Sequence, residues 1–422
     1  MHKDNRRIRL LLVLSLFLVA FSACAPNTGV LGGGTWQAVG LQHEHIRSLE
    51  VDPGNPQLLY AGDEQNGVFT STDGGSHWTQ SSVGLPSPVF VHALSFDGSG
   101  KKLYAATDHG LYVSTDKAHH WSIAGKIGSA SGDLPAGTYT SVAFDNSAPH
   151  TIYTGTMQHG VFVSTDDGTS WTSARNDLPT DIAINGLTFD SNTHQLWAAT
   201  TGGIYRSDDR GATWRAFNTG LPASLDISNI ETADSDGGAS GLIYAGTNRG
   251  FFLSHDSGAH WATSQESLQG INIPAILIDF RSTNATTVYI GTNVGAFRSD
   301  DSGDHWGGIG AGLPRGQPVY ALLIGGSGNS QLYASTNALY MFPGTSGGLS
   351  FTRLVPLLLI VALFFLLYSL MSRSRRRSLL QANRHYEPEG DAEDEPQTEP
   401  PPTTPAPIMN VPPSAEEPRE GE

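Results

Sequence analysis

The middle of the chain consists of short apolar segments that alternate with polar residues and are separated by turn residues. One repeat begins with a strand ending in Asp (Leu49-Glu-Val-Asp52), continues with one of the Leu-Tyr-Ala-Gly type (Leu59–Gly62), and then has Gly67-Val-Phe69. Apolar–polar alternation over four to eight residues is typical of half-buried β-strands. With the stretch that follows, each repeat predicts four strands.

Tryptophan marks the same repeat. Seven of the eight tryptophans stand 42, 43, 50, 43, 47 and 45 residues apart. They are Trp36, Trp78, Trp121, Trp171, Trp214, Trp261 and Trp306. A period of 40–50 residues in a strand-rich chain predicts the blades of a β-propeller.

Six of these tryptophans end an eight-residue motif, S-x-D-x-G-x-x-W. Its aspartates are Asp73, Asp116, Asp166, Asp209, Asp256 and Asp301. A short carboxylate in a tight turn accepts hydrogen bonds from free backbone N–H groups, so a structural role is expected. Ala118 replaces the motif glycine in one copy, and we expect a distorted turn there because glycine tolerates positive φ.

The motif resembles the Asp-box, or BNR repeat, of sialidases, sortilin-type receptors and photosystem II assembly factors. The resemblance covers about 310 residues and implies an all-β propeller with the box hairpins on one face. The last unit, Val319–Phe342, has three predicted strands and no box, while Gly34–Gln37 looks like the tail of a box without its head. The N-terminal strand is therefore expected to complete the last blade of a seven-bladed domain, residues 34–343. Six blades with stray ends are the alternative.

Both ends of the chain carry membrane-targeting signals. Residues 1–23 have a basic start and a 14-residue apolar run, Leu10–Ala23, typical of a signal peptide. The run ends before Cys24, the sole cysteine, in a sequence that resembles a lipobox although Phe21 replaces the usual Leu; lipidation of Cys24 and ordinary cleavage nearby both remain open.

The second apolar run, Leu354–Met371, has 18 uncharged residues and predicts a transmembrane helix over 354–372. Four arginines follow between 373 and 377, which places residues 373–422 in the cytoplasm and the propeller outside it. This tail is first basic, then acidic and Pro-rich, and is expected to be disordered.

The net charge of −16 disfavours nucleic acid as a partner, because phosphate binding needs a basic surface. No phosphate loop or converging metal-ligand cluster is found, so neither a cofactor nor a metal is expected. The histidines before the box tryptophans recur on separate blades and cannot meet at one ion.

The resemblance implies that the functional face lies opposite the boxes. The loops and entering strands there carry a polar rim suited to hydrogen-bonding a protein or a glycan. Its candidates are His45, Arg47, Glu64, Gln65, His92, Asp108, His109, Gln158, His159, Asn248 and Arg249, together with Asn66, Asn293 and Asn337.

No catalytic residue is predicted. A sialidase needs three arginines from different blades, and most arginines here stand beside boxes. A xyloglucanase-like hydrolase needs two carboxylates across a cleft. We therefore predict a membrane-anchored, extracytoplasmic propeller that serves as a non-enzymatic binding or assembly scaffold, with a cell-surface glycoside hydrolase as the alternative.

Overall fold

The computed structural model describes residues 34–343 except 127, 129–130, 149, 234–240, 265–267, 282–285, 327 and 329. The predicted signal peptide, Cys24, the predicted transmembrane helix and the tail lie outside the described residues. Within the part that is described, no helix has the length and hydropathy of a membrane span.

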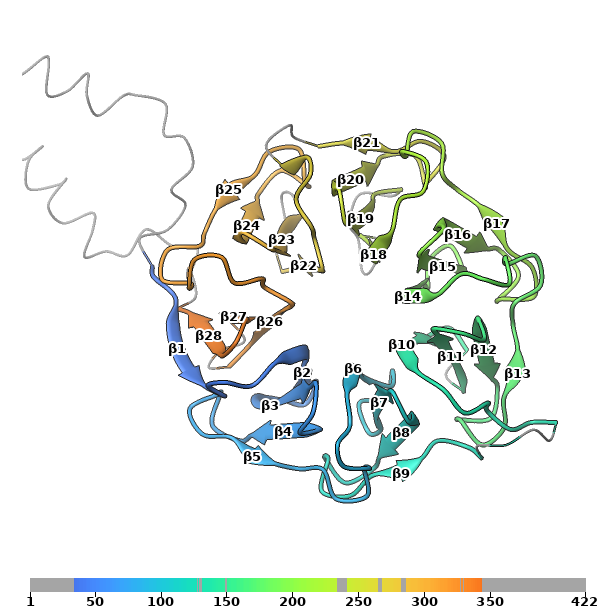
Figure 1. The fold of residues 1–422 in the computed structure, drawn as a ribbon, viewed down its shortest axis with the longest axis horizontal. Helices are drawn as coiled ribbons and strands as arrows, with labels where there is room; N and C mark the ends of the chain where they lie inside the picture. Colours follow the sequence, from blue (N-terminus) through green and yellow to red (C-terminus); the bar gives the residue numbers. More distant parts are fainter. Residues whose placement is uncertain are drawn as a thin grey trace, which may run out of the picture. The chain divides into compact units, whose positions relative to one another are not determined.

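The strands form seven four-stranded antiparallel sheets, arranged as the blades of a ring (Figure 1). From the axis outward, the first three blades are β2 (Ile46–Asp52), β3 (Asn55–Asp63), β4 (Val68–Ser71) and β5 (Thr79–Gln80); β6 (Val91–Phe96), β7 (Leu103–Thr107), β8 (Gly110–Ser114) and β9 (Ser122–Ile123); and β10 (Tyr139–Asp145), β11 (Thr151–Thr156), β12 (Val161–Ser164) and β13 (Thr172–Ser173).

The fourth, fifth and sixth blades repeat this order. They are β14 (Ile184–Asp190), β15 (Gln195–Thr200), β16 (Gly203–Ser207) and β17 (Arg215–Ala216); β18 (Ile227–Thr232), β19 (Ile243–Thr247), β20 (Gly250–Ser254) and β21 (Ala262–Thr263); and β22 (Ala275–Asp279), β23 (Thr287–Thr292), β24 (Gly295–Ser299) and β25 (Gly307–Gly308).

The seventh blade closes the ring. It contains β26 (Ala321–Gly325), β27 (Gln331–Ser335) and β28 (Leu339–Phe342), and its outer strand is β1 (Gln37–Gly40). β1 pairs antiparallel with β28, with Gln37 opposite Met341. The prediction of seven blades closed by the N-terminal strand is confirmed, and six blades are excluded.

The apolar core lies between neighbouring blades. The second strands are buried on both faces, since β11 and β19 are buried at every residue. One cluster, for example, joins Tyr60 of the first blade to Val91 and Leu103 of the second. Each sheet is thus sandwiched by two others, which accounts for the apolar runs in these strands.

The box turns share one hydrogen-bond pattern. In every copy the serine Oγ donates to the aspartate Oδ1 at 2.7–2.9 Å. The same aspartate oxygen accepts the N–H of the residue four positions later at 2.8–2.9 Å. Hydrogen bonds from the Ser170 hydroxyl and N–H lower the pKa of Asp166 to about 2.

The expectation of a distorted turn at Ala118 is wrong. Ala118 has φ +66°, and its N–H donates to Ser114 Oγ at 2.9 Å as the glycines do elsewhere. The surrounding contacts hold the left-handed backbone that an isolated alanine disfavours.

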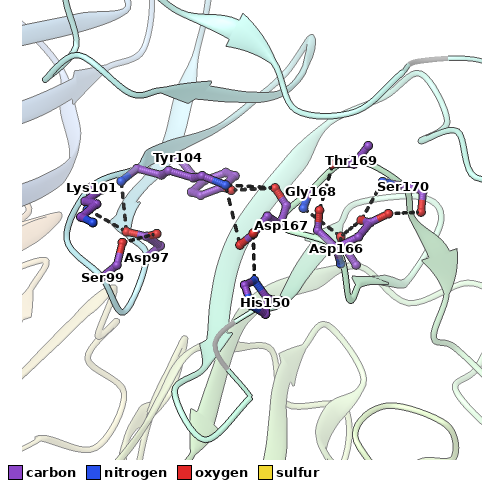
Figure 2. A network of polar contacts seen from close by, with 12 residues as sticks. Asp97, Ser99, Lys101, Tyr104, His150, Asp166, Asp167, Gly168, Thr169 and Ser170 are labelled. Carbon is purple, nitrogen blue, oxygen red and sulfur yellow. Dashed lines mark hydrogen bonds and ion pairs between the residues drawn. The ribbon is translucent and has the colours of Figure 1, made fainter.

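The boxes also connect each blade to the one before it. Figure 2 shows this between the second and third blades, where Tyr104 donates to the carbonyl oxygen of Asp167 at 3.4 Å. Within the third blade, His150 Nδ1 lies 2.9 Å from Asp167 Oδ2. In the same view Asp97, the residue after the inner strand β6, accepts the Lys101 N–H at 2.9 Å. Asp52, Asp145 and Asp190 accept the N–H of the residue two positions later, so the strand-end aspartates cap turns on the box face.

Candidate functional site

The turns that join second and third strands lie on the face opposite the boxes. Their backbones bond to the segments that enter each blade: Glu64 N–H donates to His45 O, and Asp108 N–H donates to Phe90 O, both at 3.2 Å. Because the strands are antiparallel, these turns and the box hairpins stand at opposite ends of each sheet. This face is called the rim face below.

A cavity opens at the centre of the rim face and continues along the axis. Its outer part encloses about 340 Å³ and its inner part about 300 Å³. We call the two parts together the funnel, because both are lined by the same seven residues, one from each blade. These are Arg47, His92, Thr140, Asn185, Ser228, Pro274 and Tyr320.

Two of the predicted rim residues, Arg47 and His92, line the funnel. The structure places His45, Glu64, Gln65, Asp108, His109, Gln158, His159, Asn248 and Arg249 on the surrounding turns and entering segments. His159 lines a separate outer cavity of about 290 Å³ with Asp133 and Arg175. The predicted candidates thus share a face without forming one site.

Sequence reasoning missed most of the funnel. Besides the other five ring residues, it did not select Phe90, Met157 or Asp226, which line the outer part. A signal was nevertheless present. Six of the ring residues stand 18–24 positions after a box aspartate, so aligning the repeats on the boxes would have brought them together.

Arg47 is held by two partners on the wall of the funnel. Its guanidinium forms an ion pair with Glu64 and lies over the Tyr320 ring, 3.6 Å from the centroid. The Arg47 and Glu64 side chains are 31% and 24% exposed. The charge of Arg47 is therefore compensated within the protein.

His92 and Asp226 give the outer funnel its other titratable groups. The His92 ring stacks on Phe90 with centroids 3.9 Å apart, and burial lowers the pKa of His92. Asp226, just before β18, accepts a hydrogen bond from Asn185 Nδ2 at 2.8 Å. At neutral pH His92 is therefore uncharged.

The inner part of the funnel contains a third titratable group, Glu231 of β18. Burial raises the pKa of Glu231 to about 7. Ser141, 7% exposed, also lines this part, and its hydroxyl has no hydrogen-bond partner. A second raised pKa, about 8, belongs to Glu50 on β2, again because of burial.

The acidic groups of the rim are engaged in hydrogen bonds. Asp63 accepts the N–H groups of His45, Gln65 and Asn66 at 2.7–2.8 Å. Asp108 accepts the Phe90 N–H at 2.9 Å and lies 2.8 Å from the His109 Nδ1. These bonds order the turns.

Three arginines beside the boxes lie away from the funnel. Arg206, Arg210 and Arg298 pair with Asp208, Asp145 and Asp300 on or next to the box hairpins, away from Arg47. Among the residues with described positions, no three His, Cys, Asp or Glu side chains are arranged to hold a metal ion.

Comparison with known proteins gives two kinds of sequence relative, and no family model matches the chain. The photosystem II assembly lipoprotein Ycf48 of Synechococcus sp. (strain CC9902) is 24% identical over 199 residues, which are 47% of this chain and 57% of that protein. A xyloglucanase of Paenibacillus sp. is 29% identical over 238 residues, 51% of this chain and 22% of the enzyme. The matches thus span less than two thirds of either relative.

Among solved structures, YCF48 bound to D1 peptide superposes with a TM-score of 0.57 at 16% identity, covering 77% of this chain and 99% of that one. At this identity the likeness concerns the fold. The structure and the comparisons together show that the chain contains a seven-bladed β-propeller that resembles the photosystem II assembly factor-like superfamily.

Proposed function

We propose that the propeller is a non-enzymatic binding or assembly scaffold whose funnel receives a segment of a protein partner. The observation that carries the proposal is the ring of seven different side chains around the funnel. A closed ring of blades holds these side chains rigidly, and a concave site in which a few polar groups converge is typical of ligand binding. Phe90, Met157 and Tyr320 provide apolar surface beside Asn185 and Asp226.

The comparisons support a protein ligand in preference to a glycan. A structurally similar propeller, YCF48, has been solved with a D1 peptide bound, and a sequence relative is an assembly factor. A glycan remains the second ligand class within the same proposal. No role in photosynthesis is assigned to this chain.

The proposed location rests on the sequence. Leu354–Met371 would anchor the chain in the membrane, with the propeller outside the cytoplasm and the arginine-rich segment inside it. A scaffold so placed would meet partners at the outer surface of that membrane. Protease treatment of intact cells tests this, since the propeller should be accessible and an epitope at the C-terminus should be protected.

A glycoside hydrolase is the second candidate, favoured by the similarity to a xyloglucanase. Glu231 is the funnel carboxyl whose raised pKa would suit a general acid. Such an enzyme also needs a second carboxylate about 5–9.5 Å away. The rim carboxyl groups of Asp63, Glu64 and Asp108 are bound to backbone N–H groups or to a basic side chain, which supports the scaffold.

A peptide array probed with the purified full-length chain tests the scaffold. Binding should fall in Met157→Ala and Tyr320→Ala, which alter the funnel, and stay unchanged in Lys101→Ala, an exposed residue on the box face. Equal binding by all variants would contradict the funnel as the site. Release of reducing sugar from xyloglucan that disappears in Glu231→Gln would instead establish the hydrolase.

A further inference from the structure

The carboxyl groups that line the funnel outnumber the cationic groups available to pair with them. The positive charge of Arg47 is paired with Glu64, and burial keeps His92 neutral at pH 7. Asp226 and Glu231 have no such compensation: no Lys, Arg or His with a described position lies within ion-pair distance of either. The funnel therefore holds two carboxyl groups without a cation.

The two carboxyl groups occupy different depths. Asp226, the residue before β18, lines the outer part of the funnel. Glu231, within β18, lines the inner part. Five residues of extended chain separate them, which corresponds to about 15 Å along the axis. A compact cation would meet one carboxylate, whereas a linear chain with several cationic groups would meet both.

Apart from Arg47, which is paired with Glu64, and His92, the remaining lining supplies neutral hydrogen-bonding groups. The inner strand forms one edge of every sheet, and Figure 1 shows these strands around the axis. Edge strands leave both backbone N–H and carbonyl groups without ladder partners. Of the carbonyls, Ile184 O and Ile227 O already accept from the Thr140 hydroxyl and the Asn185 amide, and other carbonyls of this edge can accept from a ligand. The buried, unpartnered Ser141 hydroxyl is a further acceptor on this wall. Ammonium groups donate three hydrogen bonds each and match such a lining.

We propose that the funnel binds a linear chain of alkylammonium groups, end on, with one ammonium at Asp226 and another at Glu231. The chain is supplied either by lysine side chains of the partner segment or by a free polyamine. This inference rests on the proposed function, because it names the chemistry of the ligand that the same funnel takes.

The energetics favour this ligand. A partly buried carboxylate without a cation is costly, and an arriving ammonium forms a charge-assisted hydrogen bond with it. The raised pKa of Glu231 reports the same unfavourable desolvation. Removal of one hydrogen bond to a charged group weakens binding roughly tenfold or more.

The test uses calorimetry on the full-length chain with three probes: spermine, a Gly-Ser peptide with two lysines, and the same peptide with norleucine in place of lysine. Asp226→Asn and Glu231→Gln should each weaken the binding of spermine or the lysine peptide about tenfold. The amide introduced by Asp226→Asn keeps an oxygen acceptor for Asn185, so the wall is preserved. Glu44→Gln, on the rim face outside the funnel, removes an equal charge and should bind like the wild type.

The outcomes separate the inference from the function on which it rests. Binding of spermine alone supports the site and assigns it to a free polyamine; binding of the lysine peptide assigns it to a protein segment. Equal binding of the norleucine peptide, or equal weakening by Glu44→Gln, overturns the ammonium site while leaving peptide binding intact. Absence of binding by all three probes overturns the inference, and the peptide array then decides the scaffold independently.

Discussion

The box glycines provide the sharpest test of how the blades pack, because one of them faces an aromatic ring directly. Gly258, in the box of the fifth blade, has φ +82°, and an added Cβ would lie 2.4 Å from Cη2 of Trp197 in the fourth blade. Trp197 is completely buried. Gly270 has φ +76° and nothing within 4 Å of an added Cβ. A comparison of substitutions at Gly258 and Gly270 therefore separates the cost of steric overlap from the cost of the backbone conformation.

The expected losses of stability follow from the backbone conformation at both glycines and from the steric overlap at Gly258. In both Gly→Ala variants the left-handed backbone costs about 1–2 kcal/mol, offset by about 0.4–1 kcal/mol from the reduced entropy of the unfolded chain. In Gly258→Ala the new methyl group would also lie 2.4 Å from the Trp197 ring, so this ring must move away to an ordinary contact distance. Overpacking of this kind costs about 1–3 kcal/mol.

Thermal unfolding of the two variants, followed by tryptophan fluorescence, measures the difference. For a domain of this size, 1 kcal/mol corresponds to roughly 2 °C, so Gly258→Ala should melt about 4 °C below Gly270→Ala. Trp197→Phe removes the atoms that clash, and its combination with Gly258→Ala should cost less than the sum of the two single changes. Equal melting temperatures for the two glycine variants, or strict additivity with Trp197→Phe, would refute the reasoning.

Three further predictions concern the funnel, a box and the closure of the ring. Burial raises the pKa of Glu231 from 4.5 to about 7, so its contribution to stability is full below pH 4.5 and declines up to pH 7. In chemical denaturation, the free energy of unfolding of Glu231→Gln should therefore rise relative to that of the wild type between pH 5 and 8. A difference that stays constant over this range would contradict the prediction. The pKa of Asp166 is lowered from 3.8 to about 2, so its ionised form stabilises the fold above pH 3.8. Asp166→Asn should therefore lower the free energy of unfolding by about 1 kcal/mol at pH 7 and by less near pH 2, as urea titrations at the two pH values would reveal. Trp36 is 4% exposed and packs on Phe342 at 5.3 Å between centroids, so Trp36→Ala should cost about 3–5 kcal/mol and promote association through opened sheet edges, which sedimentation detects; a monomer as stable as the wild type would argue against closure by this contact.

The repeat was predictable because its causes are local. Each box combines a serine, an aspartate and, in all copies but that of Ala118, a glycine within five residues, and their mutual hydrogen bonds form inside one turn. Because each box ends in a tryptophan, the period of the repeat and the place of six tryptophans can be read directly along the sequence. The distorted turn expected at Ala118 shows the limit of this argument, since the contacts around the turn outweigh the preference of one residue.

The funnel was not predictable in the same way, because its residues meet only when the ring closes. Arg47 and Tyr320 stand at opposite ends of the domain in sequence, yet the guanidinium of one lies over the ring of the other. Asn185 and Asp226 likewise belong to neighbouring blades. A polar residue on a turn looks the same in sequence whether it faces the axis or the periphery.

The sequence by itself therefore determined the type of blade, and it favoured seven blades closed by the N-terminal strand, since these follow from local periodicity and turn chemistry; the pairing of β1 with β28 then excluded six blades. The tertiary structure decided which residue of each blade faces the axis, which charges are compensated there and which are not. Convergence on an axis depends on the curvature and closure of seven packed sheets, and no single repeat carries that information.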